Sequence, residues 1–180
     1  MAAKELKIVA VGDGAVGKTS LLMVLKNEPF PERYVPTIFE NYTQELPLNG
    51  SPYKLHIWDT AGQDEYDRLR PLSYSGANAI LLCFSLESRQ TFSNCSERWI
   101  GEVRHYCKDA KIILIGTKSD LRQPGNPAHI TDDEARQFMN EQKCSDYIPC
   151  SPKTGDGVDK VFPAAAKACD QKKKGGCLLI

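Results

Sequence analysis

One segment of the sequence, residues 12–19 (GDGAVGKT), restricts the fold more than any other. It directly follows an apolar run, residues 6–11, and opens a helical pattern that extends over residues 18–26. The segment matches G-x-x-x-x-G-K-[ST], a pattern whose glycines let backbone N–H groups turn inward around phosphate oxygens at a helix N-terminus. Because glycine makes up only about 7% of protein residues, a chance match here is expected well below ~1% of the time. We therefore interpret residues 12–19 as a phosphate-binding loop.

The rest of the chain alternates between short apolar runs and helical patterns. Runs 79–85 and 111–116 are almost continuously apolar, which is typical of strands buried on both faces, and residues 147–148 mark a short last strand. Helical patterns cover residues 90–107, the segment opened by a capping box at 131–134, and an apolar stripe over 158–169. This alternation predicts an α/β fold with a mostly parallel sheet and helices on both faces.

Two details refine this prediction. Runs 42–48 and 53–58 flank Asn49 and Gly50, a dipeptide typical of a β-hairpin turn, so we expect one antiparallel edge strand in a six-stranded sheet. Pro163 falls about five residues into the last helical pattern, where proline is disfavoured, which predicts a kink or a late helix start.

Composition limits the organisation and the partners of the chain. Its 180 residues are the size of one domain, and we expect a domain over residues 1–169 and a short tail over residues 170–180. Lys plus Arg and Asp plus Glu each number 23, so the formal net charge is zero, which argues against nucleic acid as a partner. No apolar run approaches the roughly 18 residues that a membrane span needs, and residues 1–7 do not resemble a signal peptide.

The seven cysteines predict a reducing, intracellular environment. They show no Cys-x-x-Cys spacing, so neither a zinc ribbon nor a disulfide framework is expected. Six of them are interpreted as small apolar side chains; the seventh, Cys177, is taken up with the tail.

A second motif, residues 58–63 (WDTAGQ), ends the strand predicted at 53–58. An Asp at a strand end beside a phosphate loop suits Mg²⁺, usually through water, so Asp59 is a candidate metal ligand. Gly62 could offer a backbone N–H to a γ-phosphate, and Gln63 could orient an attacking water molecule. An isolated Asp after a strand is usually a turn former, and the phosphate loop is what favours the functional interpretation.

A third motif, residues 117–120 (TKSD), follows the strand predicted at 111–116. The Asp120 carboxylate could accept hydrogen bonds from guanine N1–H and the 2-amino group, a pair of donors that adenine does not have. The apolar stem of Lys118 could lie on the face of the base. Alone this tetrapeptide is a weak signal; combined with the two other motifs in this order, it favours a guanine nucleotide.

Together, these motifs resemble the small GTPases of the Ras superfamily. Residues 34–42 (YVPTIFENY), 58–63 and 64–72 (DEYDRLRPL) resemble the Rho family specifically, and the resemblance extends from about residue 4 to the C-terminus. It implies the P-loop NTPase fold, hydrolysis of GTP to GDP and phosphate, a bound guanine nucleotide and a Mg²⁺ cofactor.

The resemblance also assigns roles to individual residues. Those implied to act in catalysis are Gln63, Lys18 and Gly62, and those implied to bind Mg²⁺ are Thr19, Thr37 and Asp59. The implied nucleotide-binding residues are Gly12, Asp13, Gly14, Ala15, Val16, Gly17, Lys18, Thr19, Ser20, Phe30, Tyr34, Thr37, Asp59, Gly62, Thr117, Lys118, Asp120, Ser151, Pro152 and Lys153.

Two segments would change with the nucleotide: switch I, residues 30–42, and switch II, residues 59–74. Effectors would bind the GTP state through Tyr34, Val35, Pro36, Thr37, Ile38, Phe39, Glu40, Asn41 and Tyr42. Exchange factors, GTPase-activating proteins and dissociation inhibitors are the implied regulators of a monomeric switch. No arginine finger is evident in the chain, so we expect an arginine to be supplied by a partner.

The sequence departs from the family pattern at three places. Residues 121–130 are too few for the short extra helix that the Rho family usually carries before the last guanine motif. Thr117 stands where many members have Asn, although Rac-like members also use Thr. Residues 150–153 (CSPK) replace Ser-Ala-Lys, and Pro152 has no N–H to donate to guanine O6. We hypothesise that this bond is lost or is made by the N–H of Lys153.

The chain ends in KKKGGCLLI, residues 172–180, in which Cys177 fits the C-a-a-X prenylation pattern. The large apolar last residue favours a geranylgeranyl group, and the adjacent lysines would add attraction to anionic lipid. The tail therefore predicts a lipid-anchored protein on the cytoplasmic face of a membrane, with the plasma membrane favoured. The resemblance to the Rho family implies a role in signalling to the actin cytoskeleton.

Two alternatives stay open at this point. One is a GTP-loaded binding module with negligible hydrolysis, against which Gln63 and Gly14 argue. The other is a small P-loop kinase, which would need a lid and an acceptor site that the sequence does not show.

Overall fold

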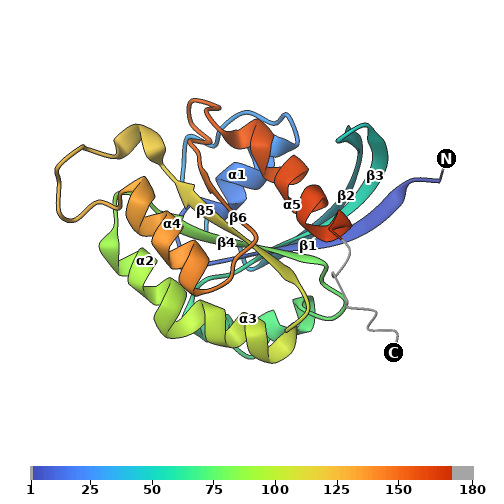
Figure 1. The fold of residues 1–180 in the computed structure, drawn as a ribbon, viewed down its shortest axis with the longest axis horizontal. Coiled ribbons are helices and arrows are strands. Elements are labelled where there is room, and N and C mark those ends of the chain that lie inside the picture. The colour runs from blue at the N-terminus through green and yellow to red at the C-terminus, as the bar shows by residue number, and fades with distance from the viewer. Residues whose placement is uncertain (1, 172–180) are drawn as a thin grey trace, which may run out of the picture.

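The structure is a computed structural model that describes residues 2–171. In this part of the chain, six strands form one sheet in the order β2-β3-β1-β4-β5-β6 (Figure 1). The strands are β1 (Lys4–Val11), β2 (Phe39–Leu48), β3 (Ser51–Thr60), β4 (Ala79–Ser85), β5 (Lys111–Thr117) and β6 (Asp146–Pro149). Every neighbouring pair is parallel except β2 and β3, which confirms the predicted antiparallel edge strand and its hairpin.

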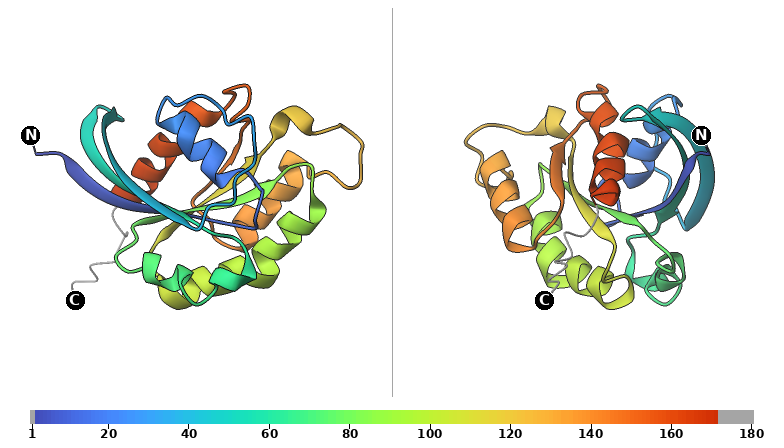
Figure 2. Two further views of the ribbon diagram at one scale, coloured as in Figure 1. Left: turned by 180° about the vertical axis from the view of Figure 1, so that it is seen from behind. Right: turned by 45° about the vertical axis from the view of Figure 1, so that its right-hand side comes forward.

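Helices cover both faces of the sheet, as predicted (Figure 2). The helices α1 (Lys18–Leu25) and α5 (Val161–Asp170) pack on one face, and α2 (Arg89–Asn94), α3 (Ile100–Tyr106) and α4 (Asp132–Glu141) pack on the other. Side chains of a strand alternate between its faces, so Ile8 joins one apolar core and its neighbour Val9 joins the other. The two cores hold the sheet rigid, and its carboxyl ends carry all three sequence motifs.

The helix predicted over residues 90–107 is not α-helical throughout. It begins as α2, continues as a π-helical segment, Cys95–Trp99, and ends as α3. Such segments insert an extra residue into a turn, and they often occur at functional sites. The apolar spacing did not reveal it, because Cys95, Trp99 and Val103 are buried in either geometry.

Local sequence signals set the ends of the later helices. Thr131 and Glu134 form the predicted capping box, each binding the backbone N–H of the other. A short 3₁₀ turn, Val158–Lys160, precedes α5, and Pro163 is the third residue of that helix. The first N–H groups of a helix have no partner within it, so proline is tolerated there. The late helix start that Pro163 predicted is confirmed.

Two more findings concern residues 2–171. The cysteines there, Cys83, Cys95, Cys107, Cys144, Cys150 and Cys169, are all free thiols. No helix in this range has both the length and the apolar character to cross a membrane. The motif around Cys177 lies outside the described residues.

The capping box yields a test of the fold. We expect Thr131→Ala to lower the free energy of unfolding by about 1 kcal/mol, because the Glu134 N–H loses its acceptor at 3.2 Å. Urea denaturation would measure the change. Thr131→Ser keeps the hydroxyl and serves as the control. If the alanine and serine variants unfold at the same urea concentration, the cap does not stabilise α4.

Candidate active site

A cavity of about 930 Å³ opens at the carboxyl ends of β1 and β3. A volume of this size accommodates a small-molecule ligand. Its walls come from residues 14–15 and 17–20 of the glycine-rich loop and α1, from residues 30–40 and 60–63, and from Lys118. The structure thus brings the three motifs to one place, as expected at the carboxyl edge of a parallel sheet.

The predicted nucleotide-binding residues fall into two groups. Those that line the cavity are Gly14, Ala15, Gly17, Lys18, Thr19, Ser20, Phe30, Tyr34, Thr37, Gly62 and Lys118. The others support the walls or lie at the base-reading end: Gly12, Asp13, Val16, Asp59, Thr117, Asp120, Ser151, Pro152 and Lys153. The residues of the phosphate loop therefore have different roles: some line the cavity, and others support the loop from behind.

The backbone of the glycine-rich loop is shaped to bind an anion. Gly12 and Gly17 have φ values of 141° and 100°, and a Cβ on Gly12 would lie 2.1 Å from the Cys83 carbonyl oxygen. Within residues 2–171, the N–H groups of residues 14–17 donate no hydrogen bond to protein. Unpaired donors at the start of a helix form an anion-binding concavity, so this loop fits phosphate.

Lys18 is buried beside this loop. Its ammonium group donates hydrogen bonds to the carbonyl oxygens of Gly12, at 2.8 Å, and Asp13, at 2.7 Å. Burial lowers the pKa of Lys18, and the nearby Asp59 and Asp13 carboxylates oppose that shift. The atoms bonded to the ammonium group are neutral carbonyl oxygens, so it has no directly bound counter-charge, which an anionic ligand in the cavity would supply.

Three oxygen-bearing side chains converge where the sequence predicted Mg²⁺. The Thr19 hydroxyl donates to Asp59 Oδ2 at 2.6 Å and forms a short hydrogen bond with the Thr37 hydroxyl. Asp59 Oδ1 is buried and has no partner among the described residues, and burial raises the pKa of this carboxyl group. The orphaned oxygen and the all-oxygen donor set fit Mg²⁺, which prefers one or two carboxylates together with phosphate and water.

Asp59 is the only carboxylate in this group of three side chains. No group of three or more His, Cys, Asp or Glu side chains is placed to bind a metal ion within residues 2–171. A metal at Asp59 would therefore need further ligands from a bound phosphate or from water.

Gly62 and Gln63 pack against the glycine-rich loop. A Cβ on Gly62 would lie 2.3 Å from the Gly12 carbonyl oxygen and 2.4 Å from the Gly14 nitrogen, so only glycine fits. The Gln63 amide faces Gly14 and donates to the Tyr34 hydroxyl at 3.4 Å. Its Oε1 atom is buried without a partner in the part of the chain described, so the amide would have to turn toward the cavity for this atom to accept from water.

The base-reading segment is linked to the phosphate loop by Thr117. Its hydroxyl contacts the carbonyl oxygens of Val16 and Phe84, which ties β5 to the loop and to β4. Threonine at this position therefore bridges the strand ends through its hydroxyl alone. Asp120 accepts from the Ser151 hydroxyl at 2.6 Å, which fixes the carboxylate predicted to read guanine.

The loop containing Pro152 leaves one backbone donor free. The Ser151 N–H donates to the Asp156 carbonyl oxygen at 2.8 Å, and the Thr154 N–H donates to the Ser151 hydroxyl at 3.2 Å. The N–H of Lys153 has no acceptor within residues 2–171. The hypothesis that Lys153 replaces the missing donor of Pro152 therefore stays a prediction, with a donor available for it.

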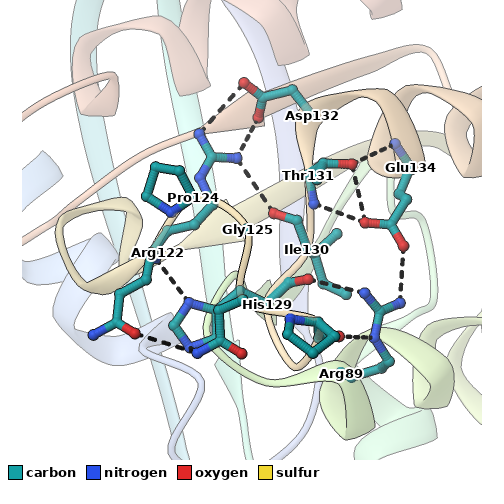
Figure 3. Close-up of a pocket in the computed structure, with 12 residues that line it drawn as sticks. Arg89, Arg122, Pro124, Gly125, His129, Ile130, Thr131, Asp132 and Glu134 are labelled. Atoms are coloured by element: carbon teal, nitrogen blue, oxygen red, sulfur yellow. Dashed lines mark hydrogen bonds and ion pairs between the residues drawn. The ribbon is translucent and has the colours of Figure 1, made fainter.

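In the segment predicted at 121–130, Leu121 ends a short 3₁₀ turn, Ser119–Leu121, and residues 122–130 contain no helix, as the length of the segment predicted. This segment borders a second cavity of about 410 Å³, and Figure 3 shows that both arginines there are paired. Arg122 binds the Asp132 carboxylate at 2.6 Å, and Arg89 binds Glu134 at 2.9 Å together with two carbonyl oxygens of the loop. These bonds hold the short loop in place without the extra helix.

The segment predicted to bind effectors presents apolar side chains to solvent. Tyr34, Val35 and Ile38 are 63%, 73% and 60% exposed, and Leu69 and Leu72 from the second switch are 58% and 74% exposed. Phe39 is 44% exposed and packs edge-on against Trp58. Large apolar side chains left in solvent on these two segments fit the prediction that protein partners bind there.

Sequence reasoning missed a buried polar cluster behind the site. The Arg70 side chain is 1% exposed; it binds both oxygens of Glu102 and the Ala61 carbonyl oxygen, and it lies over the Trp99 ring. Trp99 was interpreted as an apolar core residue, because its spacing in the helical stripe gave no sign of a polar contact. The one sequence signal for a polar contact of Trp99 was Asp13, a negative charge inside a phosphate loop that needs a hydrogen-bond donor; Trp99 Nε1 donates to it at 2.7 Å.

Comparison with protein families agrees with this geometry. The model of the Ras family matches residues 7–171, which is most of the chain.

The close packing of Gly62 provides a test of the site. We expect Gly62→Ala to lower the rate of GTP hydrolysis by about 100-fold, because the new Cβ displaces the backbone N–H from the loop. Single-turnover hydrolysis would measure this. Gly101→Ala is the control, since a Cβ there meets nothing within 4 Å. A Gly62→Ala protein that hydrolyses at the wild-type rate would show that residue 62 plays no part.

Proposed function

The chain belongs to the Ras family of small GTPases, and on that premise we propose that it is a Rho-like switch. In this proposal it hydrolyses GTP to GDP and phosphate, binds effectors only while GTP is bound, and signals at a membrane to the actin cytoskeleton. The observation that carries the proposal is the convergence of Thr19, Thr37 and Asp59 beside a loop of unpaired N–H groups.

The residues of the site have separate tasks in hydrolysis. The N–H groups of residues 14–17 and the Lys18 ammonium would stabilise the charge that spreads over the phosphate oxygens as a water molecule attacks the γ-phosphorus. Gln63 would orient that water through its unpartnered Oε1 atom. Mg²⁺ held by Thr19, Thr37 and Asp59 would neutralise phosphate charge when bound.

Thr37 connects the chemistry to the switch. It comes from the exposed segment before β2, yet its hydroxyl reaches Thr19 at the start of α1. A ligand that competes for Thr37 would therefore reposition the neighbouring Val35 and Ile38, which are exposed. This is the element that γ-phosphate would order and that hydrolysis would release.

The arginine that would complete the site is proposed to come from a GTPase-activating protein. Arg33 lies on the cavity wall but is exposed, and Arg70 is fully engaged with Glu102, Asp67 and Ala61. Gly14 has no side chain, so the space beside Gln63 is open to a partner.

The Rho-like assignment rests on residues 34–42, 58–63 and 64–72. We propose that exchange factors, dissociation inhibitors and effectors bind the exposed switch surface. We further propose that Cys177 carries a geranylgeranyl group that anchors the protein to the cytoplasmic face of the plasma membrane.

The proposed hydrolysis is tested with Gln63→Leu. We expect the rate of single-turnover GTP hydrolysis to fall about 100-fold, because leucine has no acceptor for water, while GTP binding is retained. Gln137→Leu on the exposed surface of α4 is the control. If the wild-type protein binds GTP tightly and neither protein hydrolyses it, the chain is a GTP-loaded binding module.

The proposed anchor is tested with the full chain and a geranylgeranyl donor. A type I prenyltransferase should label the wild-type protein and transfer it to vesicles that contain anionic lipid. Cys177→Ser should abolish labelling and binding, and Cys169→Ser should not. Labelling that survives Cys177→Ser would refute the assignment of the lipid to this residue.

A further inference from the structure

The carboxylate of Asp13 lies in a loop built for an anion, and two side chains hold it there. Trp99 Nε1 donates to Asp13 Oδ1 at 2.7 Å, and Asn94 Nδ2 donates to Asp13 Oδ2 at 2.6 Å. A negative charge beside bound phosphate is unfavourable by Coulomb's law. Both of its oxygens are instead engaged by donors from the helix that packs behind the loop.

The π-helical segment explains how one helix supplies both donors. Asn94 and Trp99 are five residues apart, and at 3.6 residues per turn an α-helix would direct them to different sides. The segment Cys95–Trp99 has π-helical i→i+5 geometry, which brings such a pair to the same side. The irregular helix is therefore what allows both side chains to bind one carboxylate.

The backbone of Asp13 touches two groups that act in the site. Its carbonyl oxygen accepts from the Lys18 ammonium at 2.7 Å. A Cβ on Gly62 would lie 2.4 Å from the carbonyl carbon of Asp13, so this peptide group is packed against the second switch. Fixing the Asp13 side chain thus fixes the surface on which Lys18 and Gly62 rest.

Trp99 also supports switch II, which packs against the Asp13 peptide group at Gly62. The indole is fully buried, and the Arg70 guanidinium lies 4.6 Å from its ring centre. Arg70 in turn donates to the Ala61 carbonyl oxygen at 2.9 Å, one residue before Gly62. The same indole therefore contacts the loop through Asp13 and the switch through Arg70.

We propose that Trp99 is a positioning residue for the bound nucleotide, acting through Asp13 on the phosphate loop and through Arg70 on switch II. The inference rests on the proposed function, since it concerns how firmly a guanine nucleotide is held. Asn94 supports the same loop as the second hydrogen-bond donor to Asp13.

The test measures GDP dissociation from the full chain, using a fluorescent GDP analogue. Trp99→Phe keeps a ring for Arg70 but removes the N–H, and we expect dissociation to be about tenfold faster. Asn94→Ala should also accelerate it, and because Asn94 is only half-buried this variant is informative even if Trp99→Phe does not fold. In an Asp13→Ala background, Trp99→Phe should no longer change the rate, which a general loss of stability would not produce.

Val103→Ala is the matched control, because Val103 is buried in the same core cluster and has no bond to Asp13. It should lower the unfolding temperature and leave GDP dissociation unchanged. Dissociation from Trp99→Phe and Asn94→Ala at the wild-type rate would overturn the proposal, as would an equal effect of Trp99→Phe with and without Asp13. Wild-type protein that binds no GDP would overturn the proposed function, and the inference with it.

Discussion

The site depends on a buried positive charge that the protein leaves without a full counter-charge. The Lys18 ammonium is held by the carbonyl oxygens of Gly12 and Asp13, next to a run of N–H groups that bind nothing within residues 2–171. Desolvating an ammonium group is costly, and neutral carbonyls compensate it incompletely. A phosphate ligand would satisfy the ammonium group and the N–H groups together, so its binding would stabilise the folded state.

The surrounding elements keep this arrangement in place from three directions. Thr117 ties β5 to the loop from the base-reading side, and Gly62 packs on it from the second switch. The third support is the Asp13 carboxylate, held by the π-helical segment. Switch II therefore meets the loop through the close packing of Gly62, and switch I meets it through the hydrogen bond between Thr37 and Thr19. A change at the γ-phosphate would break these contacts, while the sheet behind them stays unchanged.

The architecture could be predicted from the sequence because its signals are local. Apolar runs defined the strands, Asn49-Gly50 defined the hairpin, and Thr131 defined a helix start. The buried cluster of Arg70, Glu102 and Trp99 could not be predicted from local signals. A π-helical segment and an apolar helical stripe look alike in sequence, and the contacts of Trp99 with Asp13 and Arg70 join residues far apart in the chain. The motif residues were found because their spacing reflects chemistry, whereas Asn94 belongs to no motif and Arg70, although it lies in the segment 64–72, was given no role of its own.

Competition between guanine and adenine nucleotides tests the central claim most directly. Asp120, oriented by Ser151, would recognise guanine, while the neighbouring loop would bind the phosphates of any nucleotide. Unlabelled GDP should displace a fluorescent GDP analogue from the full chain, while ADP in about a thousandfold excess should not, because a site built to hydrogen-bond one base rejects a base without those donors. Equal displacement by ADP would contradict the account, since the phosphate loop would then bind nucleotides without regard to the base.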